Sequence, residues 1–133
     1  MRKDDWEQQL ADYLAGQADA RFVWGTCDCV LFVCGAVLAM TGEDPAAHAR
    51  GRYATRIGAM RRISQDGAKS LPDLFDAHFV RVPTGRAMRG DIVLAKDAVG
   101  VCAGRTAWFV GEDDGVAGLV PVTFDAWEAA WRV

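Results

Sequence analysis

The stretch TCDC at residues 26–29, followed by the apolar run of residues 30–40, decides how this sequence folds. A helix that is apolar on all sides must be surrounded by the rest of its domain. Thr26 or Asp28 suits the N-cap position of such a helix, and Gly42 suits the C′ position. The sequence therefore predicts a central buried helix that starts at Cys29.

Further helices are predicted on both sides of the central one. Asp5, with Gln8 three residues later, is typical of a helix start, and Gly16 of a helix end. A weaker amphipathic pattern follows residue 55, and Ser70 with Asp73 indicates a short helix after it.

After residue 78 the pattern changes to short Val-rich runs separated by Gly, Pro and Asp, which is typical of antiparallel strands. The expected strands are residues 79–82, 92–95, 99–103, 106–110 and 116–122. Trp127 and Trp131, spaced i and i+4, predict a last helix that Thr123 could cap. Helices first and strands second indicate one α+β domain over residues 1–133, with helices covering one face of a sheet of about five strands.

Composition excludes several classes of protein. A chain of 133 residues with 51% hydrophobic residues is a folded domain, and a net charge of −3 argues against a nucleic-acid-binding protein. The apolar run is shorter than the ~20 residues of a bilayer span. The charged start shows no signal peptide, and three of the four Cys lie within eight positions, so we expect synthesis in a reducing cytoplasm.

Cys29 is the leading candidate for chemistry. Unpaired N–H groups and the helix dipole at a helix N-terminus stabilise a thiolate, so a lowered pKa and a nucleophilic role are expected. The alternative is a small, inert core residue, which is the role that we assign to Cys34 in the middle of the helix.

Residues 22–29, FVWGTCDC, resemble the nucleophile segment of the NlpC-type cysteine peptidases, papain-like enzymes that cut cell-wall peptides. In that family an aromatic residue and a Gly precede Asp-Cys, and the Cys begins the central helix. Residues 89–94, RGDIVL, resemble the Gly-Asp strand of the family, and residues 99–104, VGVCAG, resemble the next strand. The resemblance implies a papain-like fold, with Trp24, Gly25 and Asp28 beside the nucleophile in the cleft.

The whole layout also resembles small proteins of phages and prophages that are encoded among tail-tip genes. The shared segments are residues 24–29, 41–45, 50–53, 90–91, 99–101 and 130–133. The resemblance implies a virion protein of the tail, assembled in the bacterial cytoplasm, whose partners are other tail-tip or hub proteins.

The sequence departs from active peptidases at one position. Ala98 stands where the resemblance implies the catalytic His, and a cysteine peptidase needs a base to accept the thiol proton. His48 and His78 are the only histidines, and either could substitute from another direction. We therefore expect an inactive fold that serves as a structural or adaptor component. The alternative is an active cell-wall peptidase or amidase that binds peptidoglycan peptides.

Two other features have open interpretations. The four cysteines, Cys27, Cys29, Cys34 and Cys102, could bind zinc or an iron–sulfur cluster, but their spacing argues against it, and we expect no metal or cofactor. Residues 46–65 contain five arginines and no acid: Arg50, Arg52, Arg56, Arg61 and Arg62. This segment is a candidate docking face for an acidic partner, or else a solvated helix face with some arginines paired to Asp44, Asp66 or residues 112–114.

Overall fold

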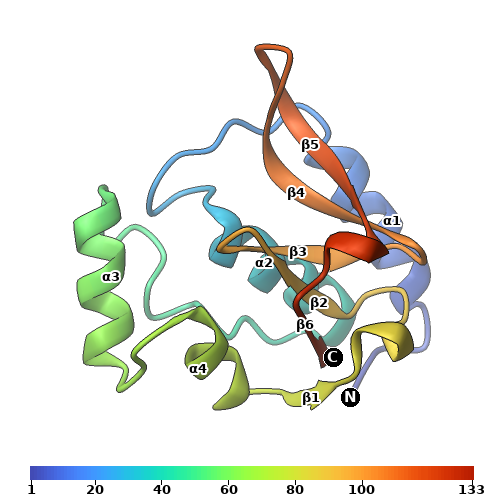
Figure 1. The fold of residues 1–133 in the computed structure, drawn as a ribbon, viewed down its shortest axis with the longest axis horizontal. Helices are drawn as coiled ribbons and strands as arrows, with labels where there is room; N and C mark the ends of the chain where they lie inside the picture. The colour runs from blue at the N-terminus through green and yellow to red at the C-terminus, as the bar shows by residue number, and fades with distance from the viewer.

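The computed structural model describes residues 1–133, with four helices followed by a sheet (Figure 1). The helices are α1 (Trp6–Gly16), α2 (Cys29–Thr41), α3 (Arg56–Gln65) and α4 (Leu71–Asp76). The strands are β1 (Val80–Val82), β2 (Ile92–Ala95), β3 (Ala98–Cys102), β4 (Thr106–Asp113), β5 (Val116–Thr123) and β6 (Ala129–Arg132). The expected α+β class is confirmed, with helices in the first half of the chain and strands in the second.

The sheet has six strands in the order β1-β6-β2-β3-β4-β5, one strand more than expected, and every neighbouring pair is antiparallel. The additional strand, β6, lies between β1 and β2. Ala130 of β6 is opposite Val82 of β1 on one side and Val93 of β2 on the other. The last strand in the chain is therefore an interior strand of the sheet.

The prediction of a helix around Trp127 and Trp131 is wrong. A 3₁₀ turn (Phe124–Ala126) precedes Trp127, and Trp131 belongs to β6. A helix of so few residues has little stability of its own, whereas a strand in this place forms backbone hydrogen bonds on both sides. The two indoles also belong to different clusters: Trp131 packs into the main core, and Trp127 packs into a second, smaller cluster.

The central helix forms as expected. The carboxylate of Asp28 accepts a hydrogen bond from the Leu31 N–H at 3.0 Å, and Gly42 ends the helix with a left-handed φ of 85°. The main core joins α2 to residues such as Val99, Val101 and Trp131 on one face of the sheet. The second cluster, which includes Val93, Cys102 and Trp127, lies on the other face. Neighbouring residues of a strand point to opposite faces, so α2 covers only one of them.

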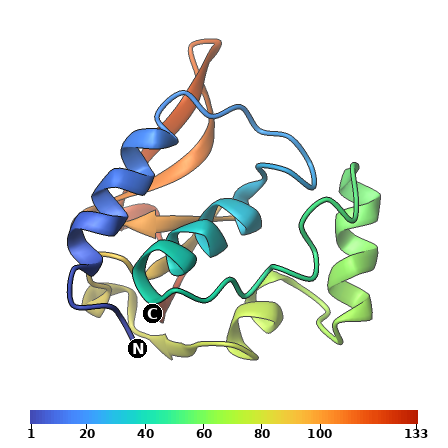
Figure 2. The same ribbon diagram turned by 180° about the vertical axis from the view of Figure 1, so that it is seen from behind.

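Two segments stand out from the rest of the molecule in both ribbon views. α3 stands at one side, apart from α2, and the β4–β5 hairpin projects beyond the rest of the sheet (Figures 1 and 2). Asp113 pairs with Val116, so Asp114 and Gly115 form a two-residue turn, and both have positive φ as such hairpin turns require. None of the helices has the length and apolar character that a membrane crossing requires.

Candidate functional site

A cavity of about 380 Å³ lies where the N-terminus of α2 faces α3 and α4. Of the 27 residues that line it, 16 are hydrophobic. Trp24, Asp28 and Cys29, all expected in a cleft, are among them. His48 and His78 line the same cavity. We call this cavity the Cys29 cleft.

Asp28 organises the loop that leads to the cleft. Its carboxylate is 1% exposed and accepts hydrogen bonds from the N–H groups of Gly25 and Leu31, each at 3.0 Å, and from the hydroxyl of Tyr53. Burial, together with the hydrogen bond to Asp28, raises the pKa of Tyr53 well above its ordinary value. The hydroxyl therefore remains a donor, and these three donors hold the carboxylate without an arginine or lysine.

Gly25 is required at its position for a steric reason. Its φ is +80°, and a Cβ atom there would lie 1.7 Å from the backbone oxygen of Tyr53. The Gly51 N–H donates to the Gly25 oxygen at 2.8 Å, so the two loops pack backbone against backbone. Trp24, the next residue back, lines the cleft and packs edge-on against Phe22, with ring centroids 4.8 Å apart.

Cys29 is the first residue of α2, and its thiol lies at the cleft. Burial raises the pKa of this thiol, although the backbone N–H groups of Val99, Val30 and Cys29 itself act in the opposite direction. The expectation of a lowered pKa is therefore wrong. The donors at the helix start do not outweigh the loss of water around the sulfur.

The start of β3 lies beside Cys29, because the Val99 N–H interacts with the sulfur. The side chain of Ala98 packs against the second cluster, on the other face of the sheet. The residue of this turn that lines the cleft is Asp97, which has a φ of 61°. Sequence reasoning identified the right turn but missed Asp97, because the left-handed backbone at Lys96 and Asp97 decides which side chain enters the cleft.

Neither imidazole hydrogen-bonds to Cys29. The ring of His48 lies 3.0 Å from a carboxylate oxygen of Asp66, and its side chain is half exposed. His78 follows α4 and lines the cleft from that side. The thiol therefore has no general base in contact with it in this arrangement.

The five arginines of residues 46–65 divide into two groups. Arg50 pairs with Asp44 at 2.6 Å, as one interpretation of the sequence expected, and also donates to the Leu31 oxygen. Arg62 donates to the backbone oxygen of His48 at 2.9 Å. Arg52, Arg56 and Arg61 are exposed, and their side chains form no ion pair or hydrogen bond. Only these three are available to a partner.

The cysteines do not form a metal site. All four are free thiols, and no group of three or more potential ligands is placed to hold a metal ion. Cys34 belongs to the main core, as expected, whereas Cys102 belongs to the second cluster, across the sheet. The thiol of Cys102 donates to the Gly104 oxygen at 3.3 Å instead.

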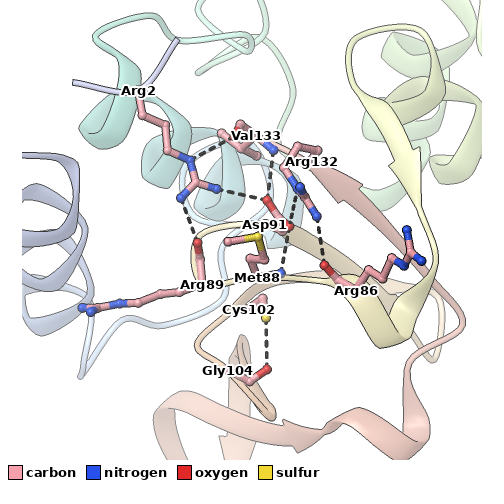
Figure 3. A network of polar contacts seen from close by, with 9 residues as sticks. All are labelled: Arg2, Arg86, Met88, Arg89, Asp91, Cys102, Gly104, Arg132 and Val133. Atoms are coloured by element: carbon pink, nitrogen blue, oxygen red, sulfur yellow. Dashed lines mark hydrogen bonds and ion pairs between the residues drawn. The ribbon is translucent and has the colours of Figure 1, made fainter. Parts of the chain in front are cut away.

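Asp91, of the Gly-Asp motif, lies away from the cleft and has a structural role (Figure 3). Its carboxylate is fully buried, pairs with Arg2 at 3.0 Å and Arg132 at 2.9 Å, and accepts the N–H groups of Met88 and Val133. Met88 is a near neighbour of Asp91 in the sequence, whereas the two arginines are distant in it. Figure 3 shows Arg2 also reaching the backbone oxygens of Arg89 and Val133. Asp91 thus joins the first and last segments of the described chain.

Comparison with family models matches residues 1–133 to the family described as a domain of unknown function (DUF6950). Comparison with curated proteins finds no match.

Proposed function

The chain belongs to the DUF6950 family, and we propose that it is a non-catalytic protein of the papain-like, NlpC-type fold that serves as a structural or adaptor component of a phage or prophage tail tip. Three features support the fold: a buried helix that starts with Cys29, a Gly-Asp turn before β2, and the start of β3 beside the sulfur. All three follow the order of the peptidase motifs along the chain.

The environment of Cys29 is the observation that carries the non-catalytic part of the proposal. Burial raises the pKa of the thiol, so the protonated form, which is a poor nucleophile, predominates at neutral pH. No imidazole hydrogen-bonds to the sulfur, and the His48 ring is hydrogen-bonded to Asp66 instead. An active cysteine peptidase needs the opposite arrangement, in which a base accepts the thiol proton.

The cleft itself supports an adaptor role. Its volume and largely apolar lining, with Trp24 at one wall, suit an extended peptide segment of a partner protein. The sequence resemblance to tail-associated phage proteins supports tail-tip or hub proteins as those partners, and the virion tail as the location.

The alternative function is an active cell-wall peptidase or amidase. Its specific support is that His48 and His78 line the same cavity as Cys29, so a movement of either ring could supply a base. Cys29 would then be the nucleophile, with its own backbone N–H contributing to the oxyanion hole.

One experiment separates the two functions. Reaction of Cys29 with an iodoacetamide probe is followed against pH in a Cys27→Ser background, because Cys27 is the other partly exposed thiol. We expect slow labelling at pH 7 that accelerates above pH 9, and no cleavage of peptidoglycan stem peptides. The matched control is the same background with His48→Ala and His78→Ala, which should label at the same rate.

Fast labelling at pH 7 that the two histidine substitutions abolish, together with peptide cleavage lost in Cys29→Ser, would establish the peptidase instead. The tail location is tested separately. Mass spectrometry of purified tails from an induced lysogen should detect the chain as a stoichiometric component, and its absence from intact tails would remove that part of the proposal.

A further inference from the structure

The α3 surface carries positive charge and exposed apolar side chains that nothing in the molecule covers. Arg52, Arg56 and Arg61 are exposed and unpaired, and beside them Ile57 is 66% exposed and Met60 50% exposed. We call these five residues the α3 face. Arg56 and Met60 also line the Cys29 cleft, so the face continues into the recess between α3 and α2.

The tip of the β4–β5 hairpin has the complementary character. Glu112, Asp113 and Asp114 are exposed and form no ion pair, and Val116, next to them, is 71% exposed. The two-residue turn makes the tip narrow, and the hairpin projects from the body of the molecule (Figure 1). A convex acidic tip with one apolar side chain therefore matches a basic, apolar face beside a recess.

The charge is divided unevenly along the whole chain. The net charge is −3, yet residues 46–65 carry +5, so the remaining residues sum to −8. The basic surface of residues 46–65 favours acidic partners and disfavours basic ones. Because the chain carries both surfaces, a second copy of the chain meets the requirement.

We propose that the acidic hairpin tip of one copy docks on the α3 face of the next copy, giving a head-to-tail assembly. Both ribbon views show α3 at one side and the hairpin tip at the top, apart from each other, so the contact is between copies rather than within one (Figures 1 and 2). Two different surfaces meet, which makes the interface heterologous, and such contacts generate a closed ring or an open filament.

The strength of the contact follows from its size and charge. A hairpin tip covers a small area, at the low end of specific interfaces (below ~1,200 Å²), so the association is weak between two copies and cooperative in a ring. Exposed charges are screened within ~10 Å at 0.1 M salt, so association should weaken as salt rises.

Charge reversal gives a direct test by sedimentation velocity over a range of protein concentration. The face variant, Arg52→Glu with Arg56→Glu and Arg61→Glu, and the tip variant, Glu112→Lys with Asp113→Lys, should each weaken self-association at least ~10-fold, because like charges then meet. All five positions are exposed, so both variants should fold. Asp114 is left unchanged because its φ is positive.

The decisive arm is complementation. An equimolar mixture of the two variants should assemble again, because each acidic tip then meets a basic face and each basic tip meets an acidic face. The matched control is Arg21→Glu, an exposed arginine outside both surfaces, which should assemble like the wild type. A second pair, Ile57→Ser and Val116→Thr, tests the apolar contact without changing charge and should also weaken assembly.

A wild-type chain that stays monomeric at low salt and high concentration would overturn the proposal. Assembly that survives the reversals, or a mixture that stays monomeric, would do so as well, since either result places the contact elsewhere. The proposal does not depend on Cys29 or on the tail location, so its failure would leave the proposed function to its own tests.

Discussion

The two buried aspartates of the molecule, Asp28 and Asp91, are stabilised in different ways. Asp91 pairs with Arg2 and Arg132 and accepts two backbone N–H groups. Asp28 has no cation and is held by two backbone N–H groups and the hydroxyl of Tyr53. Removing a carboxylate from water is costly in both cases, and each site offsets that cost with a different set of partners.

The difference shows what each carboxylate organises. The arginines of Asp91 come from the first and last segments of the described chain, so the ion pairs fix distant segments together. The donors of Asp28 come from the first turn of α2 and from two loops beside it, so its hydrogen bonds fix the start of the helix that carries Cys29. Near the cleft, burial raises the pKa of Cys29, Cys34 and Tyr53, so these thiols and this phenol remain protonated.

The largest effect is expected at Asp91. Asp91→Asn leaves Arg2 and Arg132 without their counter-charge, and we expect it to lower the free energy of unfolding by about 3 kcal/mol, at the low end for a broken buried pair because both arginines are partly exposed. Urea unfolding followed by Trp fluorescence measures it.

The control for Asp91 is Arg81→Gln, which removes an exposed ion pair with Asp76 and should change the free energy of unfolding far less than Asp91→Asn does. Equal losses in the two variants would contradict the structural role of Asp91.

A smaller effect is expected at Asp28. Asp28→Asn keeps an oxygen that can cap α2, but its NH₂ group faces the Gly25 N–H, which loses its acceptor. We expect a loss of about 2 kcal/mol, since a buried donor is left unsatisfied. The change should also alter the near-UV circular dichroism of Trp24, which Asp91→Asn should leave unchanged while the protein is folded. A Trp24 signal that changes in Asp91→Asn and not in Asp28→Asn would contradict the separate roles of the two aspartates.

We expect high pH to lower the free energy of unfolding, because a buried thiol beside the cleft stays protonated in the folded protein. Burial raises the pKa of Cys34 from 9.0 to about 12, so the folded thiol stays protonated while the unfolded one ionises. This contribution to stability is complete below pH 9 and is lost as pH rises from 9 to 12. We expect a loss of about 1 kcal/mol at pH 10 from Cys34. Unfolding midpoints from pH 7 to 10 measure it, and Cys34→Ala should flatten the dependence.

The smallest effect is expected for Tyr53→Phe, which removes one of the three donors to Asp28 and keeps the ring in place. The two backbone donors remain, so we expect a loss of about 1 kcal/mol by thermal unfolding. The matched control is Tyr13→Phe, which removes a hydroxyl donor to a neutral acceptor, the Phe32 carbonyl. Its loss of stability should be no larger than that of Tyr53→Phe. A loss for Tyr53→Phe as large as that for Asp91→Asn would show that the hydroxyl, rather than the backbone, holds Asp28.

Local signals in the sequence predicted most of the fold. Asp28 and Gly42 cap the central helix as expected, and residues 92–95 form β2 as expected, because helix caps and the Gly, Pro and Asp residues between strands act over a few residues. The strand β6 was missed because its partners, β1 and β2, are distant in the sequence, and only their pairing makes residues 129–132 extended.

The candidate site was predicted in part. One motif contains Trp24, Asp28 and Cys29, which line the same cavity. Tyr53 lies in another segment, residues 50–53, and no local signal predicted that its hydroxyl donates to Asp28, 25 residues away. The direction of the Cys29 pKa could not be read from its place on the helix, because desolvation depends on the packing of β3 and the cleft walls.

The interior place of β6 has a consequence for biosynthesis. Ribosomes add this strand after every other strand, so a nascent chain exposes the facing edges of β1 and β2 until residues 129–132 emerge. Arg132 and Val133 then close on Asp91 at the same time. A chain that lacks residues 129–132 therefore has two unpaired strand edges open to aggregation.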